Sequence, residues 1–222
     1  EKPAHCFFLY FYFARPDSRI DGRVVYDVRR KLGGLLYENH GIETDIVSPV
    51  PDSGRSFASG YAQAGDLLFG ESLMKNRYVG RTFIMPTQNQ REIAVRLKLN
   101  PIESNIKGKS LTLVDDSIVR GTTSKQLVDI LRKRGAEELH IRIGSPPISS
   151  PCYLGIDMAT SQELIASDMT VDDIREELGA DSLRYSDLDD ISEAVDFPLD
   201  HLCTGCITGE YPISGLSSEN RE

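Results

Sequence analysis

Two adjacent carboxylates, Asp115 and Asp116, stand where an apolar segment, residues 111–114, runs into a short turn rich in hydroxyl groups. Residues 117–123 of this turn precede a segment with helical spacing, so they offer unpaired backbone N–H groups at the positive end of a helix dipole. Such a turn suits a phosphate, whereas the carboxylates beside it suit ribose hydroxyls or a bound metal ion. The pattern therefore predicts a sugar-phosphate site. Taken alone, an acidic pair in this position could equally be a turn and helix cap.

A second turn, Pro-Asp-Ser-Gly at positions 51–54, lies between a predicted strand at residues 44–50 and a helix expected to begin near Phe57. These residue types favour a tight turn, which is the alternative interpretation. Ligands of parallel sheets bind outside the carboxyl ends of the strands. We therefore expect this turn and the acidic pair to face one pocket.

Apolar runs alternate with segments of helical spacing along much of the chain. The predicted strands are residues 44–50, 81–85, 110–114 and 139–143. The clearest helix covers residues 124–134, with Thr122 or Thr123 as its N-cap and Gly135 at its end. This alternation predicts an α/β fold with a mainly parallel, twisted sheet flanked by helices.

Two other segments complete the predicted organisation. The aromatic run at residues 6–13 is expected to form a buried strand. After Pro151 the chain becomes acidic and helix-prone, and helices are expected over residues 170–178 and 187–195 because acidic residues favour a helix N-terminus. We predict a core at residues 1–150 and a small C-terminal cap with a cysteine-rich region at residues 151–222, packed together as one unit.

Composition limits the possible functions. The chain has 222 residues, of which 40% are hydrophobic, and its formal net charge is -9. This acidic balance argues against a general nucleic-acid surface, because such surfaces cluster Lys and Arg. No apolar run approaches the roughly 20 residues of a membrane span. We find no leader pattern, so we expect a cytoplasmic location and no membrane partner.

Three cations, Arg91, Arg96 and Lys98, are concentrated within residues 86–100 of this acidic chain. An ordinary exposed basic helix is one interpretation. The alternative is a lid that closes over a polyanionic group and excludes water from it.

The four cysteines are Cys6, Cys152, Cys203 and Cys206, and only the last two are close in sequence, as Cys-Thr-Gly-Cys. A redox pair and a zinc site are both compatible with this pattern. Disulfides are not expected in a reducing compartment. The four histidines, His5, His40, His140 and His201, show no metal-binding spacing.

The string LTLVDDSIVRGTT at residues 111–123 resembles the phosphoribosyl pyrophosphate (PRPP) loop of the type I phosphoribosyltransferases. Four more strings resemble the amidophosphoribosyltransferases: YFARPDS (12–18), SPVPDSG (48–54), GRTFIMPTQNQREIAVRLKLNPI (80–102) and GIDMATSQELIA (155–166). Together they are spread over nearly the whole chain. The resemblance implies the type I phosphoribosyltransferase fold. It also implies a glycosyl transfer in which ammonia displaces pyrophosphate from PRPP to give 5-phosphoribosylamine, the first step of purine synthesis.

The same resemblance implies roles for individual residues. The implied PRPP-binding residues are Asp52, Ser53, Gly54, Arg96, Asp115, Asp116, Ser117, Val119, Arg120, Gly121, Thr122 and Thr123. The implied catalytic residues are Asp115, Asp116, Arg91 and Lys98. Mg²⁺ would be held by Ser53, Asp115 and Asp116, and one structural [4Fe–4S] cluster by Cys6, Cys152, Cys203 and Cys206.

Partners are implied as well. AMP and GMP would act as feedback inhibitors, and a homo-oligomer is expected. Complete enzymes of this family carry an upstream glutaminase domain, which we expect to be absent here, so this chain would use ammonia but not glutamine. Two alternatives remain: another PRPP-dependent phosphoribosyltransferase, or a non-enzymatic regulator that senses PRPP.

Overall fold

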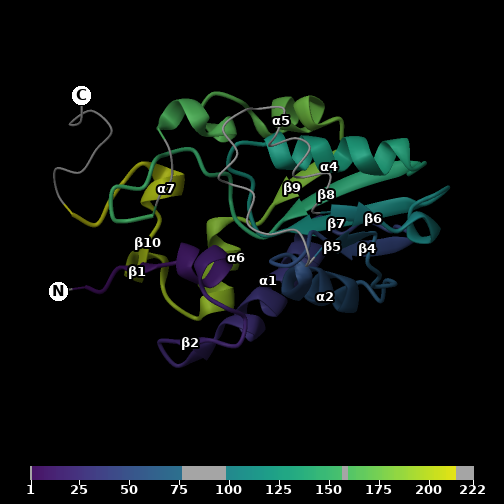
Figure 1. Cartoon of the computed structure of the whole chain (residues 1–222). Helices are drawn as coiled ribbons and strands as arrows, with labels where there is room; N and C mark the ends of the chain where they lie inside the picture. The colour runs from purple at the N-terminus through teal and green to yellow at the C-terminus, as the bar shows by residue number, and fades with distance from the viewer. Residues whose placement is uncertain (1, 77–98, 157–159, 214–222) are drawn as a thin grey trace.

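The computed structural model describes residues 2–76, 99–156 and 160–213. At its centre is a parallel sheet of four strands in the order β4-β7-β8-β9. The strands are β4 (Ile46–Pro49), β7 (Ser110–Asp115), β8 (Glu138–Ile143) and β9 (Ser182–Tyr185). The predicted α/β fold with a mainly parallel sheet is thus confirmed (Figure 1). The strand predicted at residues 81–85 lies outside the described residues.

Helices cover both faces of this sheet. α1 (Val25–His40) and α2 (Arg55–Ala64) lie on one face, and α4 (Thr122–Lys133) and α5 (Val171–Leu178) lie on the other (Figure 1). α1 and α2 approach closely because glycines stand at their contact. A Cβ at Gly33 would meet the Phe57 carbonyl oxygen at 2.0 Å. This packing fixes the position of α2 relative to α1, and the N-terminus of α2 follows the Pro-Asp-Ser-Gly turn.

The helices predicted at residues 170–178 and 187–195 are confirmed as α5 and α6 (Leu188–Val195). Each begins with a capping box, in which the side chain of Thr170 or Asp187 accepts a backbone N–H of the first turn. Between the two helices, β9 extends the core sheet, which the sequence analysis did not predict. The segment after residue 151 therefore supplies a strand of the sheet in addition to the helices expected of a cap.

The prediction of a strand at residues 6–13 is wrong. After the short β1 (His5–Cys6), the chain forms a π-helix, η1 (Leu9–Phe13). Phe7, Tyr10 and Phe11 are buried, whereas Tyr12 and Phe13 are exposed. Burial at spacings of three and four residues follows the period of a helix, while a strand would alternate. The long aromatic run concealed this difference in the sequence.

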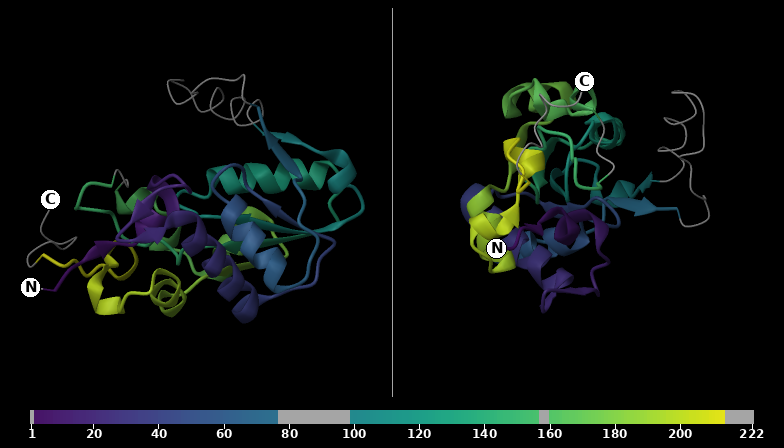
Figure 2. Two further views of the ribbon diagram at one scale, coloured as in Figure 1. Left: turned by 90° about the horizontal axis from the view of Figure 1, so that it is seen from below. Right: turned by 90° about the vertical axis from the view of Figure 1, so that its left-hand side faces the viewer.

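The two ends of the described chain lie side by side. β1 pairs in parallel with β10 (Leu202–Cys203), and β10 leads into the short α7 (Gly205–Thr208). Figure 2 shows the purple N-terminal segment next to the yellow C-terminal segment in both views.

Two antiparallel pairs lie outside the core sheet. They are β2 (Arg19–Ile20) with β3 (Arg23–Val24), and β5 (Leu73–Lys75) with β6 (Leu99–Pro101). Among the helices of the described segments, none has the length and apolar character needed to cross a membrane.

Candidate active site

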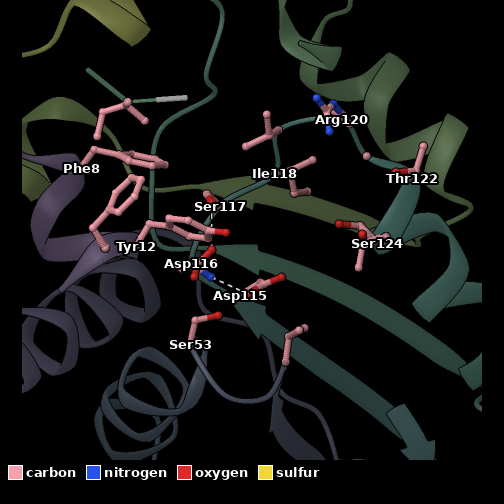
Figure 3. A pocket seen from close by; sticks show the side chains of 16 residues that line it. Phe8, Tyr12, Ser53, Asp115, Asp116, Ser117, Ile118, Arg120, Thr122 and Ser124 are labelled. Atoms are coloured by element: carbon pink, nitrogen blue, oxygen red, sulfur yellow. Dashed lines mark hydrogen bonds between the residues drawn. The ribbon is translucent and has the colours of Figure 1, made fainter. Parts of the chain in front are cut away.

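A pocket of about 460 Å³ opens at the carboxyl ends of β4 and β7. The lining residues are Phe8, Tyr12, Phe13, Val50, Ser53, Ile156 and residues 115–124. The aromatic Phe8 lies on one side of Asp115, and the hydroxyl-bearing Thr122 lies on the other (Figure 3). The two turns predicted to face one pocket therefore do so, because parallel neighbouring strands end at the same edge of the sheet.

The acidic pair forms the floor of the pocket. The backbone N–H of Asp116 donates to Asp115 Oδ1 over 2.8 Å, and the Ser117 hydroxyl donates to Asp116 Oδ1 over 2.8 Å. Asp116 is only 3% exposed, and its Oδ2 is buried with no hydrogen-bond partner among the described residues. The backbone carbonyls of both residues accept N–H bonds from Gly144 and Ser145 of the neighbouring strand end. The pair is thus held rigidly but with acceptor capacity unused.

Burial makes two negative charges costly at this floor. Burial, followed by the charge of Asp116, raises the pKa of Asp115 well above its usual range. Burial also raises the pKa of Asp116, and the interaction with the Ser53 hydroxyl offsets part of that rise. A cation, or a ligand that donates hydroxyl hydrogens, would stabilise the ionised pair.

The turn after the acidic pair is shaped to present N–H groups. Gly121 adopts a left-handed φ of 73° and immediately precedes α4. Thr122 and Thr123 are exposed residues of the first helical turn, where backbone N–H groups lack intrahelical partners. The prediction that Thr122 or Thr123 is the N-cap is wrong. Gly121 takes that position, and the left-handed backbone there leaves both threonines free to line the pocket.

A segment distant in sequence supports this turn. The backbone N–H of Ile165 donates to the Val119 carbonyl over 2.9 Å. Arg120, which lines the pocket, is half exposed and forms an ion pair with Glu163 over 2.8 Å. The turn is therefore supported from outside by residues 161–167.

The Pro-Asp-Ser-Gly turn approaches the end of β7. The Val50 N–H donates to the Val114 carbonyl over 2.8 Å, and a Cβ at Gly54 would meet that same carbonyl oxygen at 2.3 Å. Only glycine fits at this approach. α2 then begins at Arg55, two residues before the predicted start.

Of the three residues of this turn that were predicted to bind PRPP, only one lines the pocket. Ser53 lines the pocket and influences both carboxyl groups of the acidic pair. Asp52 and Gly54 are not lining residues. The Asp52 carboxylate instead accepts from Lys75 Nζ over 2.6 Å, outside the pocket wall. The predicted lid cations Arg91, Arg96 and Lys98 lie outside the described residues.

The aromatic wall was missed in the sequence. Phe8 stacks on Tyr12 with ring centroids 5.6 Å apart, and Tyr12 meets Phe13 edge to face at 5.2 Å. Tyr12 and Phe13 are 56% and 51% exposed, which is unusual for large aromatic side chains. The spacing of four between Phe8 and Tyr12 was the available signal, because it predicts one face of a helix. This wall places an apolar surface across from the polar turn.

The four cysteines form a second cluster, at the joined chain ends. Cys6 stands opposite Cys203 in the pairing of β1 with β10, and Cys206 follows in α7. The Cys206 carbonyl accepts N–H bonds from Ser149 and Ser150, which brings the loop carrying Cys152 alongside.

All four cysteines are free thiols that influence one another. Burial, followed by the charges of the other three, raises the pKa of Cys206 to about 12, and burial also raises the pKa of Cys6. Within the described part of the chain, no group of three His, Cys, Asp or Glu side chains is arranged to hold a single metal ion.

Comparison with known proteins identifies the family. The chain matches no family model. It is 58% identical over 211 residues to the amidophosphoribosyltransferase of Methanothermobacter thermautotrophicus, covering 95% of this chain and 44% of that protein. It is 47% identical over 211 residues to the Bacillus subtilis amidophosphoribosyltransferase, covering 93% of this chain and 44% of that protein. The chain thus spans about half the length of the curated relatives it matches.

Solved structures agree with these relatives. One is the glutamine PRPP amidotransferase of B. subtilis complexed with ADP and GMP, with a TM-score of 0.88 and 44% identity over 99% of this chain and 50% of that one. Another is the allosteric regulatory enzyme of purine biosynthesis, with a TM-score of 0.87 and 46% identity over 95% of this chain and 46% of that one. The chain therefore belongs to the amidophosphoribosyltransferase family and has its type I phosphoribosyltransferase fold.

Proposed function

We propose that this chain carries the phosphoribosyl-transfer site of an amidophosphoribosyltransferase. The nitrogen lone pair of ammonia forms a bond to C1 of PRPP as the bond from C1 to pyrophosphate breaks. Pyrophosphate leaves with the electron pair, and 5-phosphoribosylamine forms with inversion. The observation that carries this proposal is the single pocket in which the acidic pair, the Ser53 turn and the N-terminus of α4 converge.

Each part of the pocket suits one part of PRPP. The unpaired N–H groups and hydroxyls of residues 117–123 bind the 5-phosphate at the positive end of α4. Asp115 and Asp116 accept hydrogen bonds from the ribose 2′ and 3′ hydroxyls, which uses the free acceptor capacity of Asp116 Oδ2. The turn around Ser53 lies beside them, where the pyrophosphate would be held. This division fixes C1 between the floor and the aromatic wall.

The other residues predicted to bind PRPP or to act in catalysis have supporting roles in this proposal. Asp52 and Gly54 shape the turn around Ser53, since Gly54 fits where a side chain would not. Arg91, Arg96 and Lys98 are proposed to close over the leaving pyrophosphate. Rate enhancement then comes from orientation and from exclusion of water, because the reaction needs little proton transfer.

The donor set fits Mg²⁺. Two carboxyl groups with raised pKa, of which that of Asp116 is buried and has an unpartnered oxygen, stand beside the Ser53 hydroxyl, and oxygen donors of this kind are the ligands Mg²⁺ prefers. Asp115, Asp116 and Ser53 would hold the ion together with substrate oxygens. When bound, Mg²⁺ supplies positive charge that neutralises pyrophosphate as it leaves.

The cysteine cluster fits a [4Fe–4S] centre. The four cysteines come from β1, β10, α7 and the loop at Cys152, and the raised pKa values of Cys6 and Cys206 mean that a strongly positive partner would be needed to hold these two as thiolates. We propose that this centre is structural, because it joins the start of the described chain to its end.

Partners follow from the relatives. One similar structure is a glutamine amidotransferase with ADP and GMP bound. We propose that the complete protein obtains ammonia from glutamine through a glutaminase domain in the part that this chain does not span. Purine nucleotides such as AMP and GMP would inhibit by competing for the ribose-phosphate pocket, and the protein would act as a homo-oligomer.

The test is pyrophosphate release from PRPP and Mg²⁺, with ammonium chloride and then with glutamine. Ammonia-dependent release is expected for this chain, with a loss of about 100-fold or more in Asp115→Asn because the ribose is no longer held. Asp129→Asn, on the exposed side of α4, is the matched control and should behave as wild type. Release that requires a nucleobase instead of ammonia would favour another phosphoribosyltransferase. PRPP binding without release would favour a regulator.

A further inference from the structure

Arg120 is the only cation among the described residues that line the pocket. Arginine is well suited to phosphate, because its planar guanidinium can donate two parallel hydrogen bonds to phosphate oxygens. In this pocket, however, Arg120 Nη2 donates to Glu163 Oε2 over 2.8 Å. The cation of the pocket wall is thus paired with a carboxylate from a distant segment, although the pocket is shaped for a phosphate.

Backbone contacts on either side of Arg120 bring the two segments together. One residue before it, the Val119 carbonyl accepts the Ile165 N–H over 2.9 Å. One residue after it, a Cβ at Gly121 would lie 2.5 Å from Ile165 Cδ1. Exposed ion pairs contribute little when two mobile side chains must be ordered to form them. Here the backbones that carry the pair are already in contact.

The segment that carries Glu163 is anchored without the ion pair. The next residue, Leu164, is 2% exposed and belongs to one of the two hydrophobic core clusters. Ile165 packs against the other cluster. The Ser167 hydroxyl also donates to the Leu164 carbonyl over 2.8 Å, which stabilises the turn between them. Removal of the Glu163 carboxylate should therefore leave this segment and the phosphate-binding turn in place.

The pair changes the charge that the pocket presents to an anion. A free guanidinium in the wall would attract any small phosphate anion, whether or not the anion carried a sugar. When Glu163 balances the charge of Arg120, the donors left for a phosphate are the N–H groups and hydroxyls around the N-terminus of α4. A small anion gains only these contacts, whereas a ribose also reaches the acidic floor of Asp115 and Asp116.

We propose that Glu163 is a specificity-determining residue of the transfer site. By pairing with Arg120 it lowers the affinity of the pocket for free phosphate anions, so that contacts with the ribose decide which ligand is retained. Glu163 does not touch the substrate, and it acts through the charge of Arg120. This inference rests on the proposed function, because it concerns how the same pocket distinguishes a sugar phosphate from other anions.

Three variants test this role. Glu163→Gln removes the carboxylate charge while it keeps the shape of the side chain, so Arg120 becomes an unbalanced cation. Arg120→Gln provides a background in which that cation is absent. Glu177→Gln is the matched control, because Glu177 is half exposed and pairs with Lys125, a cation of α4 that does not line the pocket. The side chains of Arg120 and Glu163 are 58% and 48% exposed, so these changes leave the core intact.

The first readout is the dissociation constant of inorganic phosphate, measured by calorimetry at low ionic strength without PRPP. Glu163→Gln should bind phosphate about 2- to 5-fold more tightly than wild type, which is the gain expected from one exposed charge pair. Glu177→Gln should match wild type. A carboxylate that only braced the turn would have the opposite effect, because a loosened turn binds phosphate more weakly. Unchanged or weaker binding in Glu163→Gln, or an equal gain in Glu177→Gln, would overturn the proposal.

The second readout is the dissociation constant of ribose 5-phosphate in the same proteins. This ligand should gain less than inorganic phosphate in Glu163→Gln, because its ribose keeps the phosphate at the turn and away from Arg120. An equal gain for both ligands would overturn the specificity role.

The third readout shows whether the gain depends on Arg120. In the Arg120→Gln background, Glu163→Gln should no longer tighten phosphate binding, since the cation that it would expose is absent. High salt should also cancel the gain in Glu163→Gln alone, because salt screens exposed charges. A gain of the same size with and without Arg120 would overturn the assigned mechanism.

This proposal and the proposed function can fail separately. If wild-type protein releases no pyrophosphate with ammonia but phosphate binding responds to Glu163→Gln as stated, the proposed function fails while the role of Glu163 in an anion site stands. If wild-type protein is active and phosphate binding does not respond, only the role of Glu163 is overturned.

Discussion

Ile165 occupies the space that a side chain at Gly121 would need. A Cβ at Gly121 would lie 2.5 Å from Ile165 Cδ1, and the Ile165 N–H is bonded to the Val119 carbonyl two residues before the glycine. The turn that precedes α4 is therefore confined from outside the pocket as well as by its own backbone. The left-handed φ of 73° at Gly121 adds a conformational requirement that favours glycine.

Gly121→Ala should weaken PRPP binding more than it weakens the fold. The left-handed backbone should cost about 1–2 kcal/mol in the free energy of unfolding, and displacement of Ile165 or of the turn should reduce phosphate affinity. Gly108→Ala is the matched control, because Gly108 has a similar φ of 70° and a Cβ there would approach nothing nearer than 3.9 Å.

Calorimetry with and without PRPP tests this prediction. Both variants should lose several degrees of melting temperature, at about 2–4 °C for each kcal/mol in a chain of this size. Only Gly121→Ala should also lose most of the stabilisation that PRPP provides. Equal PRPP stabilisation in the two variants would show that the contact with Ile165 does not shape the site.

Asp115→Asn should stabilise the empty protein at neutral pH while removing activity. Burial and the charge of Asp116 raise the pKa of Asp115 in the folded state, so the folded protein holds this proton to a higher pH than the unfolded chain does. Stability is therefore lost as the pH rises from the unfolded pKa through the folded pKa. An asparagine does not ionise, and it avoids this loss.

The measurement is the melting temperature of Asp115→Asn and wild type across a pH series without PRPP or Mg²⁺. The variant should melt higher at pH above the raised pKa, and the difference should shrink toward about pH 4, near the ordinary aspartate value. Asp129→Asn, an exposed aspartate of α4, should show no such advantage. A variant that is less stable than wild type at neutral pH would contradict the assigned cost of the buried charge.

The sequence predicted the parts of the fold that depend on local pattern. The strands of residues 44–50, 110–114 and 139–143 are apolar runs, and each appears in the parallel sheet with its bounds shifted by a few residues. The convergence of the Ser53 turn and the acidic pair followed from their shared position after strands. Such patterns involve only a few consecutive residues, so the strands that they predict do not depend on contacts with distant parts of the chain.

The features missed depend on distant residues. The Tyr10 and Ala14 carbonyls of η1 accept hydrogen bonds from Arg29 of α1, a contact that the helical spacing of Phe8 and Tyr12 could not reveal. β9 has four residues and includes the exposed Arg184, and its strand state depends on pairing with β8. Gly121 replaced the threonines as N-cap because Ile165 fixes the approach of the turn. In each case the deciding contact comes from another part of the chain.

Asp187→Ala should destabilise the protein through α6. The Asp187 carboxylate accepts the N–H groups of Asp189 and Asp190, each over 3.0 Å, and the Asp190 carboxylate accepts the Asp187 N–H over 3.1 Å. Loss of such an N-cap costs about 1 kcal/mol, and α6 packs on α1 through the bond from Asn39 to Asp190.

Urea unfolding of Asp187→Ala and of Asp189→Ala tests this assignment. Both changes remove one negative charge near the start of α6, but only the first removes the cap. The midpoint should fall clearly in Asp187→Ala and change little in Asp189→Ala. A similar fall in both would mean that the charge, and not the cap, supports the helix.

The thiol cluster should bind iron, and its loss should separate the chain ends. Because burial and the neighbouring thiols raise the pKa of Cys206 to about 12, Cys206 would be a protonated thiol at neutral pH without a bound cluster. Ligation must therefore release protons, and four thiolates in one place need a compensating positive centre. Anaerobically prepared protein should be brown, and oxygen should bleach it.

The structural consequence is measurable at β1 and β10. Hydrogen exchange at residues 5–6 and 202–206 should accelerate in Cys203→Ser and in bleached protein, since the cluster would hold these segments together. Thr204→Ser, which leaves every thiol in place, should retain both colour and protection. A colourless, iron-free preparation in which both segments remain fully protected from hydrogen exchange would refute the cluster. Stoichiometric zinc in the purified protein would indicate a zinc site instead. The rate of pyrophosphate release need not fall in proportion to the loss of iron, because no electron moves in the proposed transfer reaction.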